Sequence, residues 1–165
     1  MLRPARFADT FRLVDILEET RKKSRYSETV NIDAERARKT LAGFIQRHGG
    51  VHDGGTCVFV VEDAAGAIQG FCVGTLYRVY LVGDRLVAQD MFLICTDDAA
   101  PGSTRKLINA YLDWAGSNPN VVEINLSWSD ALPTGQRMGP VYHRLGFVRC
   151  GEMYRRHPEH EENPS

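Results

Sequence analysis

The sequence predicts an α/β fold built on a mixed, mostly antiparallel central sheet. Three strand-like segments follow one another between residues 56 and 96, and a helix-like segment then separates the third from a further short strand-like segment. A strand, helix and strand in this order form a crossover, which places its two strands parallel. The 165 residues, 43% hydrophobic and 25% charged, have the composition of a globular domain. We expect one domain over residues 1–156 and a flexible C-terminal tail over 157–165.

Charge and hydropathy exclude several classes of partner. Lys and Arg number 20 against 21 Asp and Glu, a net charge of −1, which gives no overall electrostatic attraction for nucleic acid or an anionic membrane. Every long apolar run is interrupted within a few positions, so no membrane span is expected. Asp9 and Arg12 follow the basic N-terminal residues where a signal peptide would be apolar, so the predicted location is cytoplasmic.

The cysteines and histidines do not predict a metal site. Four cysteines lie in apolar, strand-like surroundings without a CxxC pair: Cys57, Cys72, Cys95 and Cys150. We expect buried thiols rather than a zinc site or a redox pair. His48 and His52 have the spacing of a helical metal pair, but the glycines between them end the helix. The sequence therefore predicts no metal site.

Two helices are expected before the first long strand. Asp9 and Thr10 offer an N-cap for apolar residues at near-helical spacing, which end at a basic cluster, residues 21–23. This cluster is better explained as a last turn that complements the helix dipole than as a phosphate site. A second helix opens at Asp33 and ends before Gly49.

The three strand-like segments predict an antiparallel meander. Residues 56–63 and 67–78 flank a turn, residues 79–82 either continue the second strand or end it, and residues 85–96 form the third. The third strand is apolar on both faces over residues 91–95, which predicts a central position covered on both sides. Asp90 is therefore a conspicuous charge within it.

The second half of the chain completes the predicted sheet. A helix over about residues 104–115 ends at Gly116, and a strand over 121–126 should lie parallel to the third strand. A short helix around residues 139–145 then precedes a closing strand from Phe147 to about Arg155.

The loop before the third predicted helix has the composition of an anion site. It contains a glycine for close backbone approach, two hydroxyls and two cations, in the order Ala99, Ala100, Pro101, Gly102, Ser103, Thr104, Arg105, Lys106. Backbone N–H groups at a helix N-terminus bind anions, so this loop can cradle a pyrophosphate. The same residues also suit an ordinary turn with an N-cap.

This order of elements, together with the segment Tyr-His-Arg-Leu-Gly-Phe at residues 142–147, resembles the GNAT (Gcn5-related N-acetyltransferase) superfamily. The similarity covers nearly the whole chain, including residues 2–5, which look like the family's first strand and turn. It implies a GNAT-like sheet of six to seven strands flanked by about four helices, and acetyl-CoA as co-substrate.

The resemblance also implies where acetyl-CoA lies. Its pantetheine arm would pair with strand backbone where the third strand of the meander splays from the strand at Val121, lined by Met91, Phe92, Leu93 and Ile94. Its pyrophosphate would meet the loop residues Ala99, Ala100, Gly102, Ser103, Thr104, Arg105 and Lys106. The chain departs from the family pattern, because Ala99 stands at the Arg/Gln place and Thr104 at the last small position. Arg105 or Lys106 can supply the missing charge.

Two residues are the candidates for catalysis. The resemblance assigns Tyr142 to protonating the departing thiolate, although a tyrosine there can also serve packing alone. Asp90 is a candidate general base, since a half-buried carboxylate has a raised pKa, but it can equally pair with an arginine. Glu123, Asp130 and His143 are further candidates for the base.

The resemblance also implies that the acceptor meets the sheet near the first two helices, at residues 26–31, which begin with Tyr26, and at the loop of residues 127–130. Trp128 there is either a stacking wall or core. The predicted function is acetyl transfer from acetyl-CoA directly to a primary amine, by an acyltransferase with a small-molecule or peptide acceptor. The alternative is a catalytically degenerate GNAT-like domain that binds CoA or a protein. The resemblance further implies a homodimer through the sheet edge after Phe147.

Overall fold

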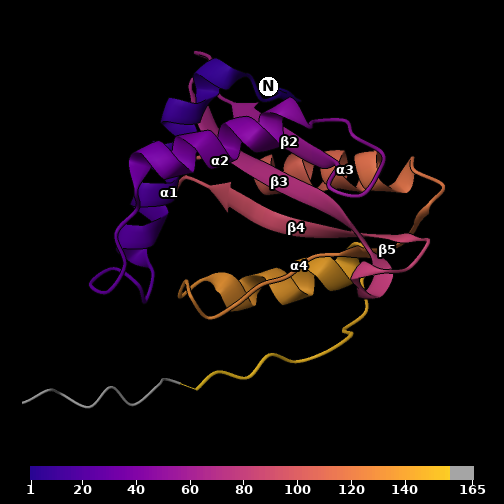
Figure 1. Ribbon diagram of the computed structural model, residues 1–165. Coiled ribbons are helices and arrows are strands. Elements are labelled where there is room, and N and C mark those ends of the chain that lie inside the picture. The colour runs from indigo at the N-terminus through magenta and orange to yellow at the C-terminus, as the bar shows by residue number, and fades with distance from the viewer. Residues whose placement is uncertain (157–165) are drawn as a thin grey trace, which may run out of the picture.

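The computed structural model describes residues 1–156 and contains one five-stranded sheet with helices on both faces (Figure 1). The strands lie in chain order: β1 (Leu2–Pro4), β2 (Thr56–Glu62), β3 (Ile68–Arg78), β4 (Leu86–Cys95) and β5 (Val121–Asn125). The helices are α1 (Thr10–Lys23), α2 (Ala34–Gln46), α3 (Ser103–Gly116) and α4 (Met138–Arg144). Short 3-10 turns lie at η1 (Phe7–Asp9), η2 (Val79–Leu81) and η3 (Gly135–Arg137). No helix among the described residues is long and apolar enough to cross a membrane.

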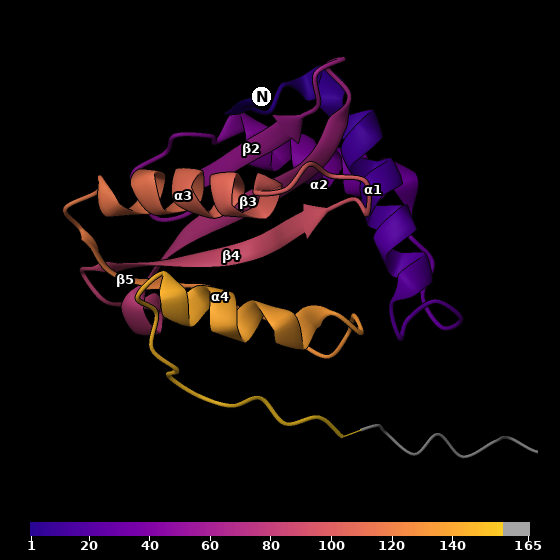
Figure 2. The same ribbon diagram turned by 180° about the vertical axis from the view of Figure 1, so that it is seen from behind.

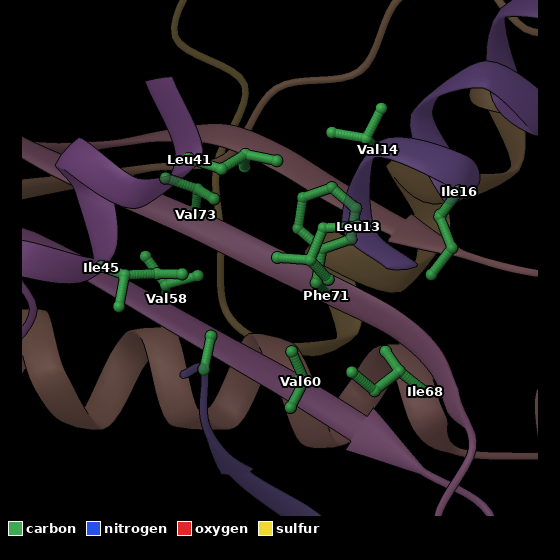
Figure 3. Packing of buried hydrophobic residues seen from close by; sticks show 11 residues of the cluster. Leu13, Val14, Ile16, Leu41, Ile45, Val58, Val60, Ile68, Phe71 and Val73 are labelled. Carbon is green, nitrogen blue, oxygen red and sulfur yellow. The ribbon is translucent and has the colours of Figure 1, made fainter. Parts of the chain in front are cut away.

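The first half of the chain confirms the predicted helices and meander. The Asp33 carboxylate accepts a hydrogen bond from the amide of Arg36 at 3.0 Å and so caps α2. Strands β2, β3 and β4 pair antiparallel in succession, and β1 joins the outer edge of β2. The face toward α1 and α2 carries the larger core, shown in Figure 3 as side chains that converge from both helices onto β2 and β3. Its residues include Leu13, Ile16, Leu41, Ile45, Val58, Val60, Phe71 and Val73.

Helix α3 covers the opposite face, as Figure 2 shows from behind. Leu107, Tyr111 and Ala115 lie on its buried side, at helical spacing, and pack on the sheet residues Cys72 and Leu76. The crossover from β4 through α3 brings β5 parallel to β4, as predicted. Residues of β4 pack on both faces of the sheet, as its sequence pattern indicated. The central position predicted for residues 91–95 is wrong, because β5 pairs with β4 only as far as Gln89 and Met91 is 49% exposed.

The prediction of a closing strand after Phe147 is wrong, so the sheet has five strands rather than six or seven. Gly146, at φ +87°, ends α4, and the chain then runs along α4 without joining the sheet (Figures 1 and 2). A strand needs backbone partners, and beyond Phe147 no residue up to 156 makes a backbone ladder contact.

Cys150 is accordingly exposed, whereas Cys57 and Cys72 are buried and Cys95 is partly buried, so the burial predicted for all four thiols was wrong at Cys150.

The segment between β3 and β4 forms a turn. Residues 79–82 do not continue β3, because Tyr80 and Leu81 take positive φ values of 53° and 66° in a 3-10 turn. Residues 157–165, for which a flexible tail was expected, lie outside the described residues.

Candidate active site

Strands β4 and β5 separate halfway along β4. Their parallel pairing runs from Leu86 opposite Val121 to Gln89 opposite Asn125 and then stops. From Asp90 onward β4 pairs only with β3 among the described strands. Val73 faces Phe92 and Gly74 faces Asp90, so Met91 is the extra residue of a β-bulge at the point of separation.

The four residues assigned to the pantetheine arm lie along this separated part of β4. The Met91 side chain is 49% exposed, whereas Phe92, Leu93 and Ile94 are partly buried. Phe92 and Ile94 pack toward α1 and α2, and Leu93 packs toward α3. Their side chains therefore point to the faces of the sheet, and their backbone forms the strand edge beside the gap.

The loop after β4 presents unpaired amides at the start of α3. Gly102 has a left-handed φ of 84° and leads into Ser103, the first residue of the helix. The amides of Gly102, Thr104 and Arg105 have no acceptor among the described residues. Such amides, aligned with the helix dipole, form an anion site.

Other polar groups of this loop already form hydrogen bonds within the protein. The amide of Ala99 donates to the Thr96 carbonyl at 3.1 Å, and the amide of Ala100 donates to Oε1 of Gln69 at 3.2 Å. The Thr104 hydroxyl lies 3.5 Å from Sγ of Cys95. The sequence does not point to Gln69, because its contact with the loop arises from the pairing of β3 with β4 rather than from a motif.

The charged residues of this loop face different surroundings. Arg105 is exposed on the first turn of α3. Lys106 borders a groove of about 470 Å³ between α3 and the β1–β2 edge, together with Phe59 and Trp114. The methyl group of Ala99 offers no hydrogen bond or charge to a phosphate, so the groups of this loop best suited to an anion are its backbone amides and Arg105.

Asp90 lies at the opposite end of the separated edge. Its Oδ1 accepts three hydrogen bonds: from the Ser127 amide at 2.9 Å, from the Ser127 hydroxyl at 3.0 Å and from Nε2 of Gln89 at 2.7 Å. Burial raises the pKa of Asp90, and these hydrogen bonds oppose that rise in part. No arginine among residues 1–156 pairs with Asp90, so the alternative of an arginine salt bridge is wrong.

Tyr142 reaches the same point from α4. Its side chain is buried against the ring of Phe147, with centroids 6.0 Å apart, and its hydroxyl donates to the Ser127 carbonyl at 3.0 Å. Burial, followed by the negative charge of Asp90, raises the pKa of Tyr142. The phenol is thus kept protonated and able to donate a hydrogen bond at neutral pH.

Ser127 joins the two candidate catalytic residues, a role that the sequence did not reveal. Its backbone and hydroxyl contact Asp90 and Tyr142 because β5 ends at Asn125 and the chain turns back toward α4. The only sequence signal is a polar stretch directly after a strand. The resulting site contains a carboxylate suited to accept a proton and a phenol suited to donate one.

The other candidates for a general base are placed elsewhere. Glu123 accepts a hydrogen bond from Asn125 at 2.8 Å on the exposed side of β5, and His143 is exposed on α4. Asp130 is held in ion pairs with Arg25 at 2.7 Å and Arg155 at 2.9 Å. None of the three contacts the Asp90–Ser127–Tyr142 group through a hydrogen bond within residues 1–156.

The two aromatic residues assigned to the acceptor are half exposed. Tyr26, 41% exposed, lies in the loop between α1 and α2 and accepts a hydrogen bond from Nη2 of Arg25 at 2.7 Å. Trp128 is 49% exposed, and its indole lies against α4, where a Cβ added at Gly139 would be 3.4 Å from Nε1. Trp128 is therefore not a fully buried core residue.

No family model matches the chain in sequence, and no curated protein matches it. Solved structures match it in fold over nearly its whole length. The glucosamine-6-phosphate N-acetyltransferase from Arabidopsis thaliana aligns with a TM-score of 0.69 and 10% identity, over 96% of this chain and 98% of that one. A ribosomal-protein-alanine N-acetyltransferase from Brucella melitensis aligns with a TM-score of 0.64 and 13% identity, over 95% and 99%.

A third similar structure carries a different kind of name. A transcriptional regulator from Bacillus halodurans aligns with a TM-score of 0.67 and 20% identity, over 95% of this chain and 98% of that one. At sequence identities this low, a structural match supports a shared fold but not a shared activity. The chain has the mixed α/β fold of the Gcn5-related N-acetyltransferases.

Proposed function

We propose that this protein is an N-acetyltransferase that moves an acetyl group from acetyl-CoA directly to a primary amine. One observation carries the proposal. The separated edge of β4 runs from Asp90 to Cys95, about 17 Å at roughly 3.3 Å per residue, with anion-binding amides at one end and Asp90 and Tyr142 at the other. That length suits an extended pantetheine arm between its pyrophosphate and its thioester.

The residues present fit acetyl-CoA. The amides of Gly102, Thr104 and Arg105 would hold the pyrophosphate, and Arg105 adds a positive charge. The backbone of residues 91–94 would pair with the amides of the pantetheine arm as an added strand does. Acetyl-CoA, when bound, supplies the activated acyl group as a thioester.

The protein's own groups would then manage two protons. Asp90 accepts the proton from the attacking amine, for which its raised pKa suits it better than an ordinary aspartate. Tyr142 turns its hydroxyl from the Ser127 carbonyl to the departing sulfur and donates to it. No covalent link to the enzyme is required, because amine and thioester meet directly at the end of the gap.

The two proton transfers, to Asp90 and from Tyr142, support each other electrostatically. The Asp90 charge contributes to the raised pKa of Tyr142. Once Asp90 has taken the amine proton this charge is gone, and Tyr142 becomes a stronger acid when the thiolate leaves. Proton uptake at Asp90 therefore favours proton donation at Tyr142.

We propose a homodimer as the working assembly. Strand β5 pairs only with β4 among the described strands, so no further strand joins its outer edge. Large apolar side chains beside this edge and on the segment after α4 are exposed: Val122 at 60%, Val148 at 82%, Met153 at 90% and Tyr154 at 86%. A second copy covering this surface would remove them from water. Sedimentation equilibrium of the parent and of Val122→Lys tests the assembly.

Calorimetric titration with acetyl-CoA and with CoA tests the proposed activity first. The parent should bind in the micromolar range, and Gly102→Glu should lose binding because a carboxylate then stands at the amides meant for phosphate. Gly49→Glu is the matched control, since Gly49 also has a positive φ, 78°, and open space around its Cβ, but it lies at the end of α2. Absence of binding by the folded parent would contradict the proposal.

The alternative, a CoA-binding or protein-binding module without turnover, rests on Ala99 and on the similar fold of a protein named a transcriptional regulator. Tight CoA binding by the parent, without acetyl transfer to any amine in a broad panel, would favour this alternative. Transfer that Tyr142→Phe weakens would favour the enzyme.

A further inference from the structure

Two loops meet beside the end of the gap where an acceptor would enter. The amide of Arg25, in the loop after α1, donates to the carbonyl of Ala131, in the loop after β5, at 3.0 Å. The guanidinium of Arg21 donates to the Val30 carbonyl at 3.1 Å and also to the Ser27 carbonyl. The loop after α1 is therefore ordered by internal bonds and tied to its neighbour.

A charged cluster lies where these loops join. Asp130 accepts from Nη1 of Arg25 at 2.7 Å and from the two terminal nitrogens of Arg155 at 3.0 and 2.9 Å. Two guanidinium groups thus share one carboxylate, and the cluster keeps a net positive charge. Asp130 is already neutralised and is poorly suited to bind an ammonium group.

Arg25 is held in a fixed orientation. Besides its bond to Asp130, it donates to the Tyr26 hydroxyl at 2.7 Å and its Cζ lies 4.8 Å from the centre of the Tyr26 ring. Its remaining N–H groups have no acceptor among residues 1–156. A planar guanidinium fixed in this way can bind a carboxylate or phosphate with two parallel hydrogen bonds at a low cost in side-chain entropy.

The cluster lies close to the reacting centre. Asp130 follows Ser127 by three residues, so their Cα atoms are at most about 11 Å apart. Ser127 contacts both Asp90 and Tyr142, and Trp128 lies between it and the cluster along the chain. One small molecule can therefore reach both the reacting centre and the charged cluster.

We infer that the acceptor is an amine that also carries an oxyanion, a carboxylate or a phosphate, several bonds from its nitrogen, and that Arg25 binds this anion. The inference rests on the proposed acetyl transfer for the amine end only. Arg25 is an acceptor-specificity residue, Tyr26 orients its guanidinium, and Asp90 receives the amine proton.

A matched set of straight-chain amines tests this assignment. The probes are 6-aminohexanoate, 6-aminohexyl phosphate, 6-aminohexanol and 1,6-diaminohexane, assayed for acetyl transfer at low and high salt. For the parent, kcat/KM should be at least about tenfold higher for one of the anionic probes than for the alcohol, and salt should reduce this preference. The two anionic probes distinguish carboxylate from phosphate recognition. Equal kcat/KM for the alcohol and both anions would overturn the inference.

Three variants test whether Arg25 causes the preference for an anionic acceptor. Arg25→Gln should abolish it by raising KM for the anionic probe more than KM for 6-aminohexanol, and Arg25→Lys should restore only part of it. Arg36→Gln, an exposed arginine on α2, is the control and should behave as the parent. A preference that survives in Arg25→Gln would also overturn the inference.

A binding measurement separates this inference from the proposed reaction. Titration of the parent with the two anionic probes, without acetyl-CoA, should show saturable binding that Arg25→Gln loses and that 6-aminohexanol does not reproduce. Such binding without acetyl transfer would support the anion site and contradict the acetyltransferase. If the parent binds neither anionic probe, the anion site is wrong, whatever acetyl-CoA does.

Discussion

The hydroxyl of Tyr142 lies 3.0 Å from the carbonyl oxygen of Ser127. The amide and hydroxyl of the same serine hold the carboxylate of Asp90. Three elements, β4, the loop after β5 and α4, are thereby joined at the point where the sheet separates. The arrangement gives each of the three residues a distinct, measurable effect.

Replacing Tyr142 by Phe should lower kcat by about 10²-fold or more, within the range for a positioned general acid. The ring stays against Phe147, so the fold should lose only the bond to the Ser127 carbonyl, about 1 kcal/mol. Steady-state kinetics and thermal unfolding check the two parts. An unchanged kcat in a folded Tyr142→Phe protein would assign the tyrosine to packing alone.

Asp90 should make both activity and stability depend on pH, in opposite directions. Activity should rise as pH increases through its raised pKa, because the base must be ionised. Its contribution to stability should fall as pH rises from the unfolded value, ~3.9, to the raised folded value, because the folded state then binds more protons than the unfolded state.

Asp90→Asn isolates these two effects. It keeps an oxygen for Ser127 and Gln89 but carries no charge, so it should lose activity while its melting temperature at neutral pH equals or exceeds that of the parent. A large loss of stability at neutral pH would show instead that the charge of Asp90 stabilises the fold.

Ser127→Ala should shift the acid limb of the pH–rate profile to higher pH. The variant removes the hydroxyl bond to the ionised carboxylate but keeps the amide bond, so the pKa of Asp90 should rise further. Ser127→Thr retains a hydroxyl and should behave more like the parent. A lower kcat with an unshifted profile would mean that Ser127 only shapes the loop.

Gly74→Ala should destabilise the protein by about 1–3 kcal/mol through overpacking. Gly74 faces Asp90 across β3 and β4, and a Cβ there would lie 2.5 Å from the Tyr111 ring. That ring is fully buried, and its hydroxyl donates to the Asn125 carbonyl at 2.9 Å, at the end of β5. Thermal unfolding measures the effect, with Gly43→Ala on α2, where a Cβ meets no atom within 4 Å, as the control.

Local sequence patterns predicted most of the elements, because hydrophobic periodicity and caps such as Asp33 act within a few residues. They failed after Phe147, where apolar residues suggested a strand but no described neighbour pairs with it. The candidate site was predicted only in part. Asp90 and Tyr142 stand out by type and motif, whereas Ser127 and Arg25 act through contacts between residues distant in sequence, which no local pattern encodes.

Gln69 provides the last prediction, on the loop proposed for the pyrophosphate. Its side-chain oxygen accepts from the Ala100 amide at 3.2 Å, and its backbone carbonyl accepts from the amide and the hydroxyl of Thr96 at 2.8 and 3.1 Å. The side chain therefore fixes the loop that presents the amides of Gly102, Thr104 and Arg105.

Gln69→Ala should raise the dissociation constant of CoA severalfold, because the loop then pays an ordering entropy on binding. Gln69→Glu keeps the acceptor for Ala100 but adds a negative charge beside the phosphates, so it should weaken binding further, and more at low salt than at high salt. Calorimetry at two salt concentrations distinguishes the effect of lost loop order from the effect of the added negative charge. If both variants bind CoA as the parent does, the pyrophosphate lies away from this loop, and the assignment of Gly102, Thr104 and Arg105 fails with it.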